Sequence, residues 1–371
     1  MAFSCKKILM IRLGAIGDVI RTLPALDALR KKFPAAHIAW VVEEKSESIL
    51  AGHPQLDELI IIQRKKWAAN IRNPATFFPT IKEILLFIKE LREKRFDTVL
   101  DFHGIFKSGL TGFLSGADKR FGFASKFTKE INFLFNNHRI DLPSEKINRV
   151  ERNLFLLRQM GIYPDSHRSQ AVFPLFDKDK KAMDIFFRQN LDPGRKPIIV
   201  IHAGSSEGTE YKRWEPAKYA CLADALIENY NGEVIFTWGG SEIKIVQEIT
   251  NMMRNESVIA CPTTSLRELV QLIKRCDLYI GGDTAPMHIA AFSHVPVVAI
   301  FGPTDPVINA PFGDNDSFIV RKDLPCSPCR NRKCKTRECT KKVSPEEVFT
   351  AVKNLISHMQ SMENQEQIYA D

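Results

Sequence analysis

A carboxylate beside a glycine-containing turn is the first residue of this sequence with a clear chemical use. Asp18 follows the run at residues 14–17 and opens an expected helix over residues 19–32. The positive end of a helix dipole favours an ionised carboxylate in the first turn. Asp18 is therefore a candidate general base that takes the proton of an acceptor hydroxyl. An ordinary acid at a helix N-terminus fits the same spacing equally well.

A second set of candidates has residue types suited to a nucleoside diphosphate. A lysine follows a loop of Gly, Ser and Thr at residues 204–209, where its charge would neutralise phosphate. A later helix is expected to begin near residue 284, and the free N–H groups at a helix N-terminus bind phosphate. Taken singly, each residue has an ordinary structural explanation. The candidates are Lys212, Asp283, Thr284, Ala285 and His288.

Glu242 follows an apolar run and a Trp-Gly-Gly turn. Its carboxylate would accept hydrogen bonds from both hydroxyls of a ribose, or serve as the first-turn acid of a helix over residues 243–253. Two Asp-x-Asp sequences, at residues 177–179 and 314–316, match the D-x-D motif with which many sugar-nucleotide enzymes hold a metal. Their polar surroundings predict solvated loops. Fixed positive charge at Lys212 and at the helix N-terminus would make a metal unnecessary for catalysis.

Four of the eight cysteines crowd into one basic stretch of 14 residues. In a chain with no expected disulfides, such spacing indicates a structural Zn²⁺ or a packed, redox-reactive loop. The spacing is not that of a paired zinc ribbon, so both interpretations stay open. The candidate metal ligands are Cys326, Cys329, Cys334 and Cys339.

Short apolar runs alternate with helix-period segments and would position these candidates. Four runs precede residue 101, and four more lie between residues 198 and 301. This alternation predicts an α/β protein with two doubly wound domains of parallel strands. The candidates follow the runs, and ligands of open α/β sheets bind beyond the carboxyl ends of the strands. We expect domains at residues 1–175 and 176–343, with a helix over residues 344–360 that packs back on the first.

The order and spacing of five short motifs resemble glycosyltransferase family 9, the ADP-heptose:lipopolysaccharide heptosyltransferases. The motifs span most of the chain, at residues 11–26, 212–214, 238–239, 282–288 and 301–306. The resemblance implies a GT-B fold, with two Rossmann-like domains facing across a cleft. It implies metal-independent transfer of a heptose, with inversion, from ADP-heptose to the inner core of lipopolysaccharide. By the same match, Asp18 is the general base, Lys212 binds the diphosphate, Glu242 binds the ribose, and Ser205 lies near the phosphates.

The net charge of +8 suits an anionic partner, and residues 61–129 alone carry 14 Lys and Arg against 6 Asp and Glu. With the resemblance, this segment predicts a lipid A-Kdo type acceptor and reversible binding to the cytoplasmic side of the inner membrane. A solvated charged face is the plainer explanation. Residues 116–139 look like a basic insertion, and four aromatic residues are candidates for lipid or sugar contact: Trp67, Phe121, Phe123 and Phe127. The acceptor candidates are Arg64, Lys65, Lys66, Lys107 and Arg120.

Two other functions fit parts of the sequence. A sugar-nucleotide epimerase would use the same fold and donor loops. A basic, zinc-containing nucleic-acid-binding protein would use the cysteine-rich stretch, and its binding would weaken steeply with salt. The loop motifs at the strand ends are superfluous for binding a nucleic-acid backbone, so no nucleic-acid partner is expected.

Overall fold

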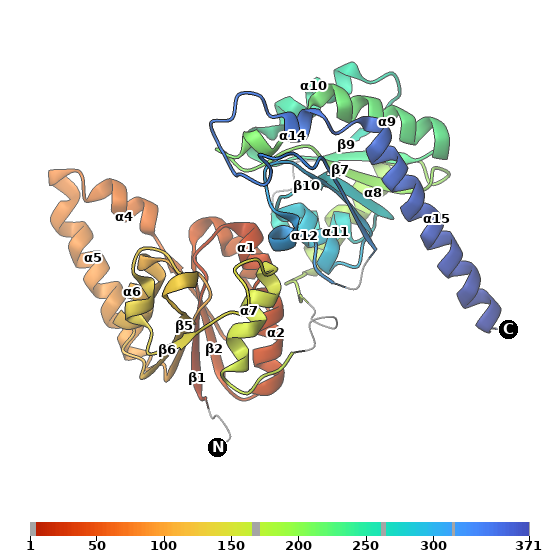
Figure 1. Cartoon of the computed structure of the whole chain (residues 1–371). Helices are drawn as coiled ribbons and strands as arrows, with labels where there is room; N and C mark the ends of the chain where they lie inside the picture. Colours follow the sequence, from red (N-terminus) through yellow and green to blue (C-terminus); the bar gives the residue numbers. More distant parts are fainter. Residues whose placement is uncertain (1–4, 165–170, 261–264, 314–315, 371) are drawn as a thin grey trace. The chain divides into compact units, whose positions relative to one another are not determined.

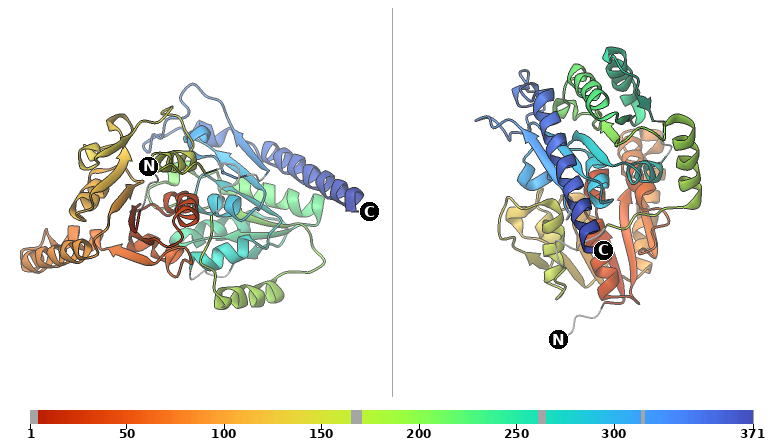
Figure 2. Two further views of the ribbon diagram at one scale, coloured as in Figure 1. Left: turned by 90° about the horizontal axis from the view of Figure 1, so that it is seen from below. Right: turned by 90° about the vertical axis from the view of Figure 1, so that its right-hand side faces the viewer.

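The computed structural model describes residues 5–164, 171–260, 265–313 and 316–370, apart from the side chains of residues 241 and 362–370. The chain divides into two compact units, Met1–Pro174 and Leu175–Asp371. Each unit is a parallel six-stranded sheet between layers of helices (Figures 1 and 2). The sequence analysis placed the boundary one residue later, after residue 175.

The first unit has the strand order β3-β2-β1-β4-β5-β6. Its central strand β1 (Lys7–Ile11) pairs in parallel with β2 (His37–Glu43) and β4 (Thr98–Asp101). Towards the edges follow β3 (Glu58–Ile62), β5 (Lys119–Phe123) and β6 (His138–Ile140). The inner strands are buried on both faces because helices cover the sheet on either side, and this explains their continuous apolar runs.

The helices of the first unit fall into two layers. α2 (Leu23–Lys32) and α7 (Arg149–Arg158) cover one face, while α5 (Pro74–Glu93) and α6 (Phe106–Leu114) lie on the other (Figure 1). The shorter helices α1 (Ile16–Ile20), α3 (Glu47–Leu50) and α4 (Arg64–Asn70) follow strand ends. Single 3-10 turns occupy Glu44–Ser46, Ser125–Phe127 and Asn132–Phe135.

Two expectations for the first unit were wrong. The helix expected over residues 19–32 is broken into α1 and α2, because Pro24 lacks an N–H and its ring would clash with the carbonyl of Ile20. Residues 116–139 are no insertion, since they contain β5, its whole connection to β6 and the first two residues of β6. Their Lys and Arg hid this, because the basic residues of β5 and β6 stand at strand positions that are not fully buried.

The second unit repeats the architecture with the order β12-β11-β10-β7-β8-β9. Its centre is β7 (Ile198–His202), flanked by β10 (Leu278–Gly282) and β8 (Glu233–Thr237). The other strands are β9 (Val258–Ile259), β11 (Val297–Phe301) and β12 (Ser317–Arg321). One face carries α9 (Pro216–Tyr230), α10 (Ile243–Met252) and α15 (Pro345–Ala370), and the other carries α8 (Asp177–Asn190), α11 (Leu266–Ile273) and α12 (Ala285–Phe292) (Figure 1). The remaining helical pieces are α13 (Pro306–Asn309), α14 (Glu338–Lys341) and 3-10 turns at Glu210–Lys212 and Gly240–Glu242.

The buried face of the C-terminal helix α15 belongs to the second unit. Val348, Val352 and Leu355 lie in the hydrophobic core shared with α9 and β11. These apolar positions are therefore covered within the second unit, and the packing of residues 344–360 back on the first domain stays a prediction. The capping box predicted at Ser344 is confirmed, since Ser344 and Glu347 exchange side-chain to backbone hydrogen bonds.

The D-x-D spelling at residues 177–179 is not a solvated loop. It forms the first turn of α8, where Asp179 is 2% exposed and pairs with Arg267 at 3.2 Å. The sequence could not indicate this, because Arg267 is 88 positions away and belongs to α11. At the second spelling, residues 314 and 315 lie outside the described part of the chain. Within the described ranges, no helix is both long and apolar enough to cross a bilayer.

We expect Asp179→Ala to lower the free energy of unfolding by about 3 kcal/mol, because it leaves the largely buried Arg267 without its carboxylate. Asp177→Ala is the matched control, since Asp177 is an exposed acid two positions away and should change stability by less than about 0.5 kcal/mol. Urea unfolding of both variants measures the difference. Equal midpoints for the two variants would contradict this role of Asp179.

Candidate active site

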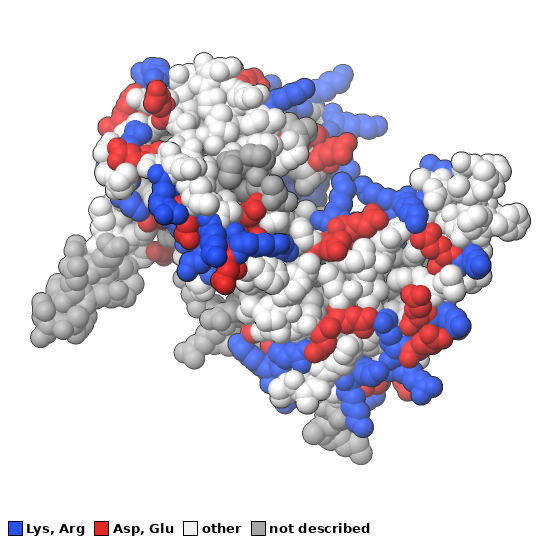
Figure 3. Space-filling model, turned by 180° about the vertical axis from the view of Figure 1, so that it is seen from behind, with Lys and Arg blue, Asp and Glu red and all other residues white. Residues whose placement is uncertain are grey.

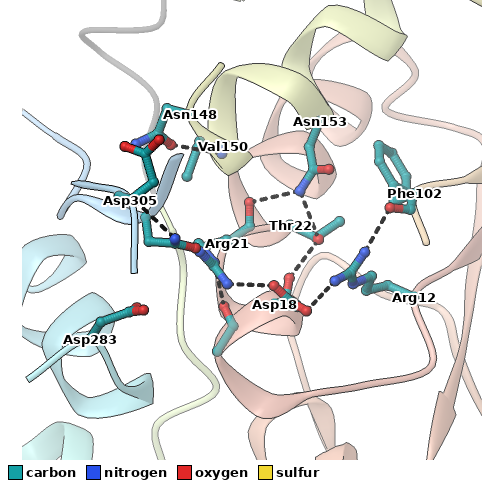
Figure 4. A network of polar contacts seen from close by, with 12 residues as sticks. Arg12, Asp18, Arg21, Thr22, Phe102, Asn148, Val150, Asn153, Asp283 and Asp305 are labelled. Atoms are coloured by element: carbon teal, nitrogen blue, oxygen red, sulfur yellow. Dashed lines mark hydrogen bonds and ion pairs between the residues drawn. The ribbon is translucent and has the colours of Figure 1, made fainter. Parts of the chain in front are cut away.

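Asp18 lies at the carboxyl edge of the first sheet, in the first turn of α1. Its two carboxylate oxygens are taken by two arginines: Arg12 binds Oδ2, and Arg21 binds Oδ1 at 2.5 Å (Figure 4). Arg12 also donates to the carbonyl of Phe102 at 2.8 Å, at the end of β4. The side chains of both arginines are at most 10% exposed, whereas that of Asp18 is 26% exposed. The carboxylate is thus reachable from solvent while its partners are not.

The electrostatics of this cluster hold Asp18 in its ionised form. Burial would raise its pKa, but attraction to Arg12, Arg21 and Arg149 outweighs burial and holds the pKa well below its usual range. A carboxylate in this setting stays charged at any physiological pH. It is also a weaker base than a free aspartate, because proton uptake must compete with the arginines.

The same edge gathers basic residues that the sequence analysis missed. Arg149 and Arg152 lie on α7, and Arg152 donates to the carbonyl of Phe127 at 2.8 Å. Burial and the neighbouring Arg149 and Arg12 lower the pKa of Arg152 to about 9. His103 follows β4, and burial together with Arg12 lowers its pKa to about 3, so this imidazole is neutral. Arg149 and Arg152 give only a weak signal in the sequence. They are a basic pair three positions apart that follows Asn148, the residue that caps α7.

Asn153 fixes the backbone that carries this arrangement. Its amide donates to the carbonyl of Arg21 at 3.1 Å and to the hydroxyl of Thr22 at 3.0 Å. Thr22 in turn donates to the carbonyl of Asp18 at 2.8 Å (Figure 4). The break between α1 and α2 is therefore tied to α7, and the Asp18 side chain has a defined position.

In the second unit, four of the candidates for the donor site line one small pocket: Ser205, Lys212, Asp283 and Thr284. Lys212 donates to Asp283 Oδ2 at 3.0 Å, so the loop after β7 and the end of β10 are joined by an ion pair. Arg213 donates to the side chain and to the carbonyl of Ser205, both at 2.8 Å. The structure brings these residues together, with Arg213, which follows the same Gly, Ser and Thr loop in the sequence, as the second cation of the pocket.

Glu242 lies directly against the loop after β7. A Cβ atom at Gly204 would lie 2.3 Å from Glu242 Cδ, so only glycine leaves room for this carboxylate. Glu242 accepts the N–H of Gly239 at 2.8 Å and lies 3.8 Å from His202 Nε2. Burial raises its pKa, against the effect of the Gly239 N–H and of Arg213. A hydroxyl ligand would therefore find an acceptor whose position is already set.

The predicted phosphate-binding helix is present as α12, of which Thr284 is the N-cap residue and Ala285 the first residue. Thr284 is half-buried and lines the pocket beside Asp283, and Ala285 is half-buried next to it in the first turn. His288 is 1% exposed, inside the helix layer. The structure therefore groups Asp283 and Thr284 with Lys212 at the pocket, whereas Ala285 is not among the lining residues and His288 packs in the interior.

Protein contacts already engage three of the five predicted acceptor residues. Arg64 pairs with Glu43 at 2.5 Å, Lys66 pairs with Glu83 at 2.8 Å, and Arg120 donates to the carbonyl of Phe135 at 2.8 Å. Lys65 and Lys107 are exposed. Of the five acceptor candidates, Arg64 is the one whose charge contributes to lowering the pKa of His103, which places Arg64 near the Asp18 cluster. A local charge count could not separate solvated cations from those paired inside the fold.

The predicted lipid-facing aromatic residues are mostly interior. Phe121 and Phe123 are at most 1% exposed within β5, and Trp67 is 9% exposed and packs edge-on against Phe87 at 5.4 Å. The prediction of lipid or sugar contact was therefore wrong for these three side chains. Phe127 is half-buried, with the ammonium of Lys126 5.6 Å from its ring centre.

The cysteine-rich stretch packs on the loop after β11. The N–H groups of Cys329 and Arg330 both donate to the carbonyl of Pro303 at 3.0 Å, and Cys339 is buried beside Gly302. Among the described residues, no three His, Cys, Asp or Glu side chains are grouped to hold a metal ion. Zinc ligation by Cys326, Cys329, Cys334 and Cys339 remains a prediction.

Comparison with known proteins gives a family match over most of the chain. Residues 84–340 match the profile of glycosyltransferase family 9 (heptosyltransferase). The chain is 28% identical over 360 residues to lipopolysaccharide heptosyltransferase 1 of Campylobacter coli, covering 94% of this chain and 98% of that protein. The match therefore extends over both units.

Solved structures share the fold. The family 9 glycosyltransferase of Veillonella parvula superposes with a TM-score of 0.80 at 23% identity, over 95% of this chain and 98% of that one. The E. coli heptosyltransferase WaaC with ADP-2-deoxy-2-fluoro heptose gives a TM-score of 0.71 at 20% identity, over 95% and 99% of the chains. A UDP-GlcNAc 2-epimerase from Methanocaldococcus jannaschii gives 0.51 at 16% identity, over 94% and 92%. These similarities confirm the expected GT-B class.

The Asp18 cluster predicts a stability effect. Asp18→Asn should lower the free energy of unfolding by about 2 kcal/mol, because two buried arginines lose their counter-charge while the partly exposed carboxylate limits the loss. Denaturant unfolding in the wild-type and Arg21→Gln backgrounds measures the coupling. Glu83→Gln, which breaks the exposed pair with Lys66, is the control and should lower the free energy of unfolding far less than Asp18→Asn, because solvent screens an exposed pair. The same cost of Asp18→Asn in both backgrounds would contradict the coupling.

Proposed function

The chain belongs to glycosyltransferase family 9, and we propose that it transfers a heptose from ADP-heptose to the inner core of lipopolysaccharide. The observation that carries the proposal is that the carboxyl edge of each sheet holds residues suited to one substrate. The first unit has a partly exposed carboxylate among arginines, and the second has a pocket lined by cations. The names of its relatives support the substrate classes, since they include a lipopolysaccharide heptosyltransferase and a heptosyltransferase bound to a fluorinated ADP-heptose.

In this proposal the second unit binds the donor. The diphosphate takes the place of Asp283 at the ammonium of Lys212 and faces the N-terminus of α12. The carboxylate of Glu242 accepts hydrogen bonds from the ribose hydroxyls. Ser205 and Arg213 border the phosphates, because their mutual hydrogen bonds hold the loop after β7 at the pocket.

The first unit binds the acceptor and carries the base. Acceptor carboxylates and phosphates suit the four arginines at residues 12, 21, 149 and 152, whose positive charges act together on the pKa of Asp18 and of Arg152. Asp18 accepts the proton of the attacking hydroxyl. A weak base is sufficient here, because the hydroxyl proton becomes acidic as its oxygen bonds to a centre with oxocarbenium character. An acceptor anion that draws Arg12 or Arg21 away would also strengthen the base.

We propose that transfer inverts the anomeric configuration and needs no metal ion. Attack by the acceptor oxygen on the face opposite to the leaving ADP is a single displacement, and its outcome is inversion. Lys212, Arg213 and the α12 N-terminus provide fixed positive charge where negative charge develops on the departing diphosphate.

We further propose that the protein works at the cytoplasmic face of the inner membrane, bound peripherally. The acceptor is then part of a lipid, and the basic surplus at residues 61–129 attracts anionic headgroups. No specific observation favours the alternatives. The epimerase shares the fold alone, and the nucleic-acid-binding hypothesis leaves the donor pocket without a role.

The central test is transfer by the purified protein in the presence of EDTA. We expect one heptose to be added to a Kdo-containing acceptor from ADP-heptose, with inverted configuration by NMR. Asp18→Asn, assayed below its melting temperature, should lose most of its turnover because an amide cannot take the proton. An isomerised donor formed without acceptor would favour an epimerase instead. Activity lost in EDTA and restored by Mg²⁺ would refute the metal-free mechanism.

Donor affinity tests the pocket. Lys212→Ala should weaken ADP binding at least tenfold, because a charge-assisted phosphate contact is lost. Gly204→Ala should weaken it as well, since the new methyl displaces the Glu242 carboxylate. Lys244→Ala, an exposed lysine of α10, is the matched control and should bind normally. Titration calorimetry with ADP measures all three, and unchanged affinity for Lys212→Ala and Gly204→Ala would place the donor elsewhere.

A further inference from the structure

Helices α4 and α5 form a hairpin that projects from the first unit, with its turn at residues 71–73 (Figures 1 and 2). Only the base of the hairpin is anchored. Trp67 and Leu91 belong to the core of the first unit, and Phe87 packs against that core. The outer half therefore extends beyond the sheet and its helices.

The hairpin exposes large apolar side chains at its turn and along α5. Phe78, near the turn, is 78% exposed, and Leu85 and Leu86, in the inner half of α5, are 60% and 48% exposed. Phe77 and Ile71 lie at the turn and are 37% and 38% exposed. Apolar side chains scattered singly over a surface are ordinary, but five on one projecting hairpin mark an interaction site.

The turn presents these side chains on a defined backbone. The side chain of Asn73 accepts the N–H of Ala75 at 3.1 Å and so caps α5. The hydroxyl of Thr76 donates to the carbonyl of Asn70 at 2.7 Å, which closes the turn. The rings of Phe77 and Phe78 lie edge to face, 5.3 Å apart. Little ordering is then required when the tip meets a partner.

Basic residues accompany the apolar ones. Residues 64–94 contain eight Lys and Arg against three Glu. Lys82 and Lys89 are exposed one turn from Phe78 and Leu85, and Arg72 is exposed at the turn itself. Figure 3 shows the end of the hairpin, at the upper right, as mostly uncharged surface with Lys and Arg beside it. This mixture is typical of segments that lie at a lipid interface, with apolar groups among the acyl chains and cations at the headgroups.

We propose that the α4–α5 hairpin inserts its apolar tip into an anionic lipid bilayer and so anchors the protein at the membrane. The inference deepens the proposed membrane association and rests on that part of the proposed function. A second copy of the chain is the poorer occupant, because pairing two tips would bring their basic residues together. An anionic lipid surface satisfies both the charge and the apolar side chains.

The test is vesicle binding with matched variants of exposed aromatic residues. Vesicles of phosphatidylethanolamine with phosphatidylglycerol are titrated with wild type, with Phe78→Ser and with Tyr163→Ser, whose parent side chain is 77% exposed in the same unit. Phe78→Ser should bind the vesicles about tenfold more weakly, because the variant has no phenyl ring to transfer from water into the acyl chains. Tyr163→Ser should bind like wild type, and Lys82→Ser should bind more weakly only at low salt.

Insertion has a second readout that does not depend on affinity. Phe78→Trp should be quenched by bromine-labelled lipid, whereas Tyr163→Trp should not. Equal vesicle binding of wild type and Phe78→Ser, or no quenching of Phe78→Trp, would overturn the proposal. A shift of Phe78→Ser from dimer to monomer without vesicles, at unchanged vesicle binding, would assign the tip to a second copy. Phe78→Ser should transfer normally to a water-soluble, delipidated acceptor. If the wild type itself shows no transfer to this acceptor, the proposed function is refuted, while the vesicle results still decide whether the hairpin inserts into the membrane.

Discussion

Parallel strand pairing is the constraint on which the chemistry of this protein depends. When β1, β2 and β4 run in the same direction, their carboxyl ends open at one edge, and the loops that follow them meet there. Asp18, after β1, thus comes within reach of His103, after β4, and of Arg149 at the start of α7. The second sheet does the same for the loops after β7, β8 and β10. Residues dozens of positions apart therefore become neighbours without any long loop.

Bringing several cations together at one edge of a sheet costs electrostatic free energy. Both units lower this cost by pairing the cations with a carboxylate. In the first, Asp18 pairs with Arg12 and Arg21 and offsets part of their charge, and in the second, Asp283 pairs with Lys212. Each carboxylate lowers the cost of burying its cations. In the proposed function, phosphates or sugar acids of the substrates become partners of the same cations.

The surface of the first unit shows how tertiary contacts divide a run of similar residues. Along residues 61–129, basic and aromatic residues alternate with little pattern. Folding sends Phe121 and Phe123 into the sheet and pairs Arg64 with Glu43, while Phe78 and Leu85 stay on the projecting hairpin. Local hydrophobicity cannot make this division, because it depends on whether a helix face meets the sheet or extends past it.

Short-range patterns in the sequence were enough to predict the α/β class, the two doubly wound units with a boundary one residue from the observed one, the motifs that indicate the family, and the set of residues that share a pocket with Lys212. Apolar runs mark buried strands, and glycine and polar residues mark the loops after them. Which charges act together could be seen only in the folded chain. The arginine pair on Asp18, the approach of Arg149 and Arg152, the burial of Asp179 against Arg267 and the contact of Glu242 with Gly204 all join separate elements. Their partners lie far apart along the chain, and no local pattern encodes which loops the closing of a sheet will bring together.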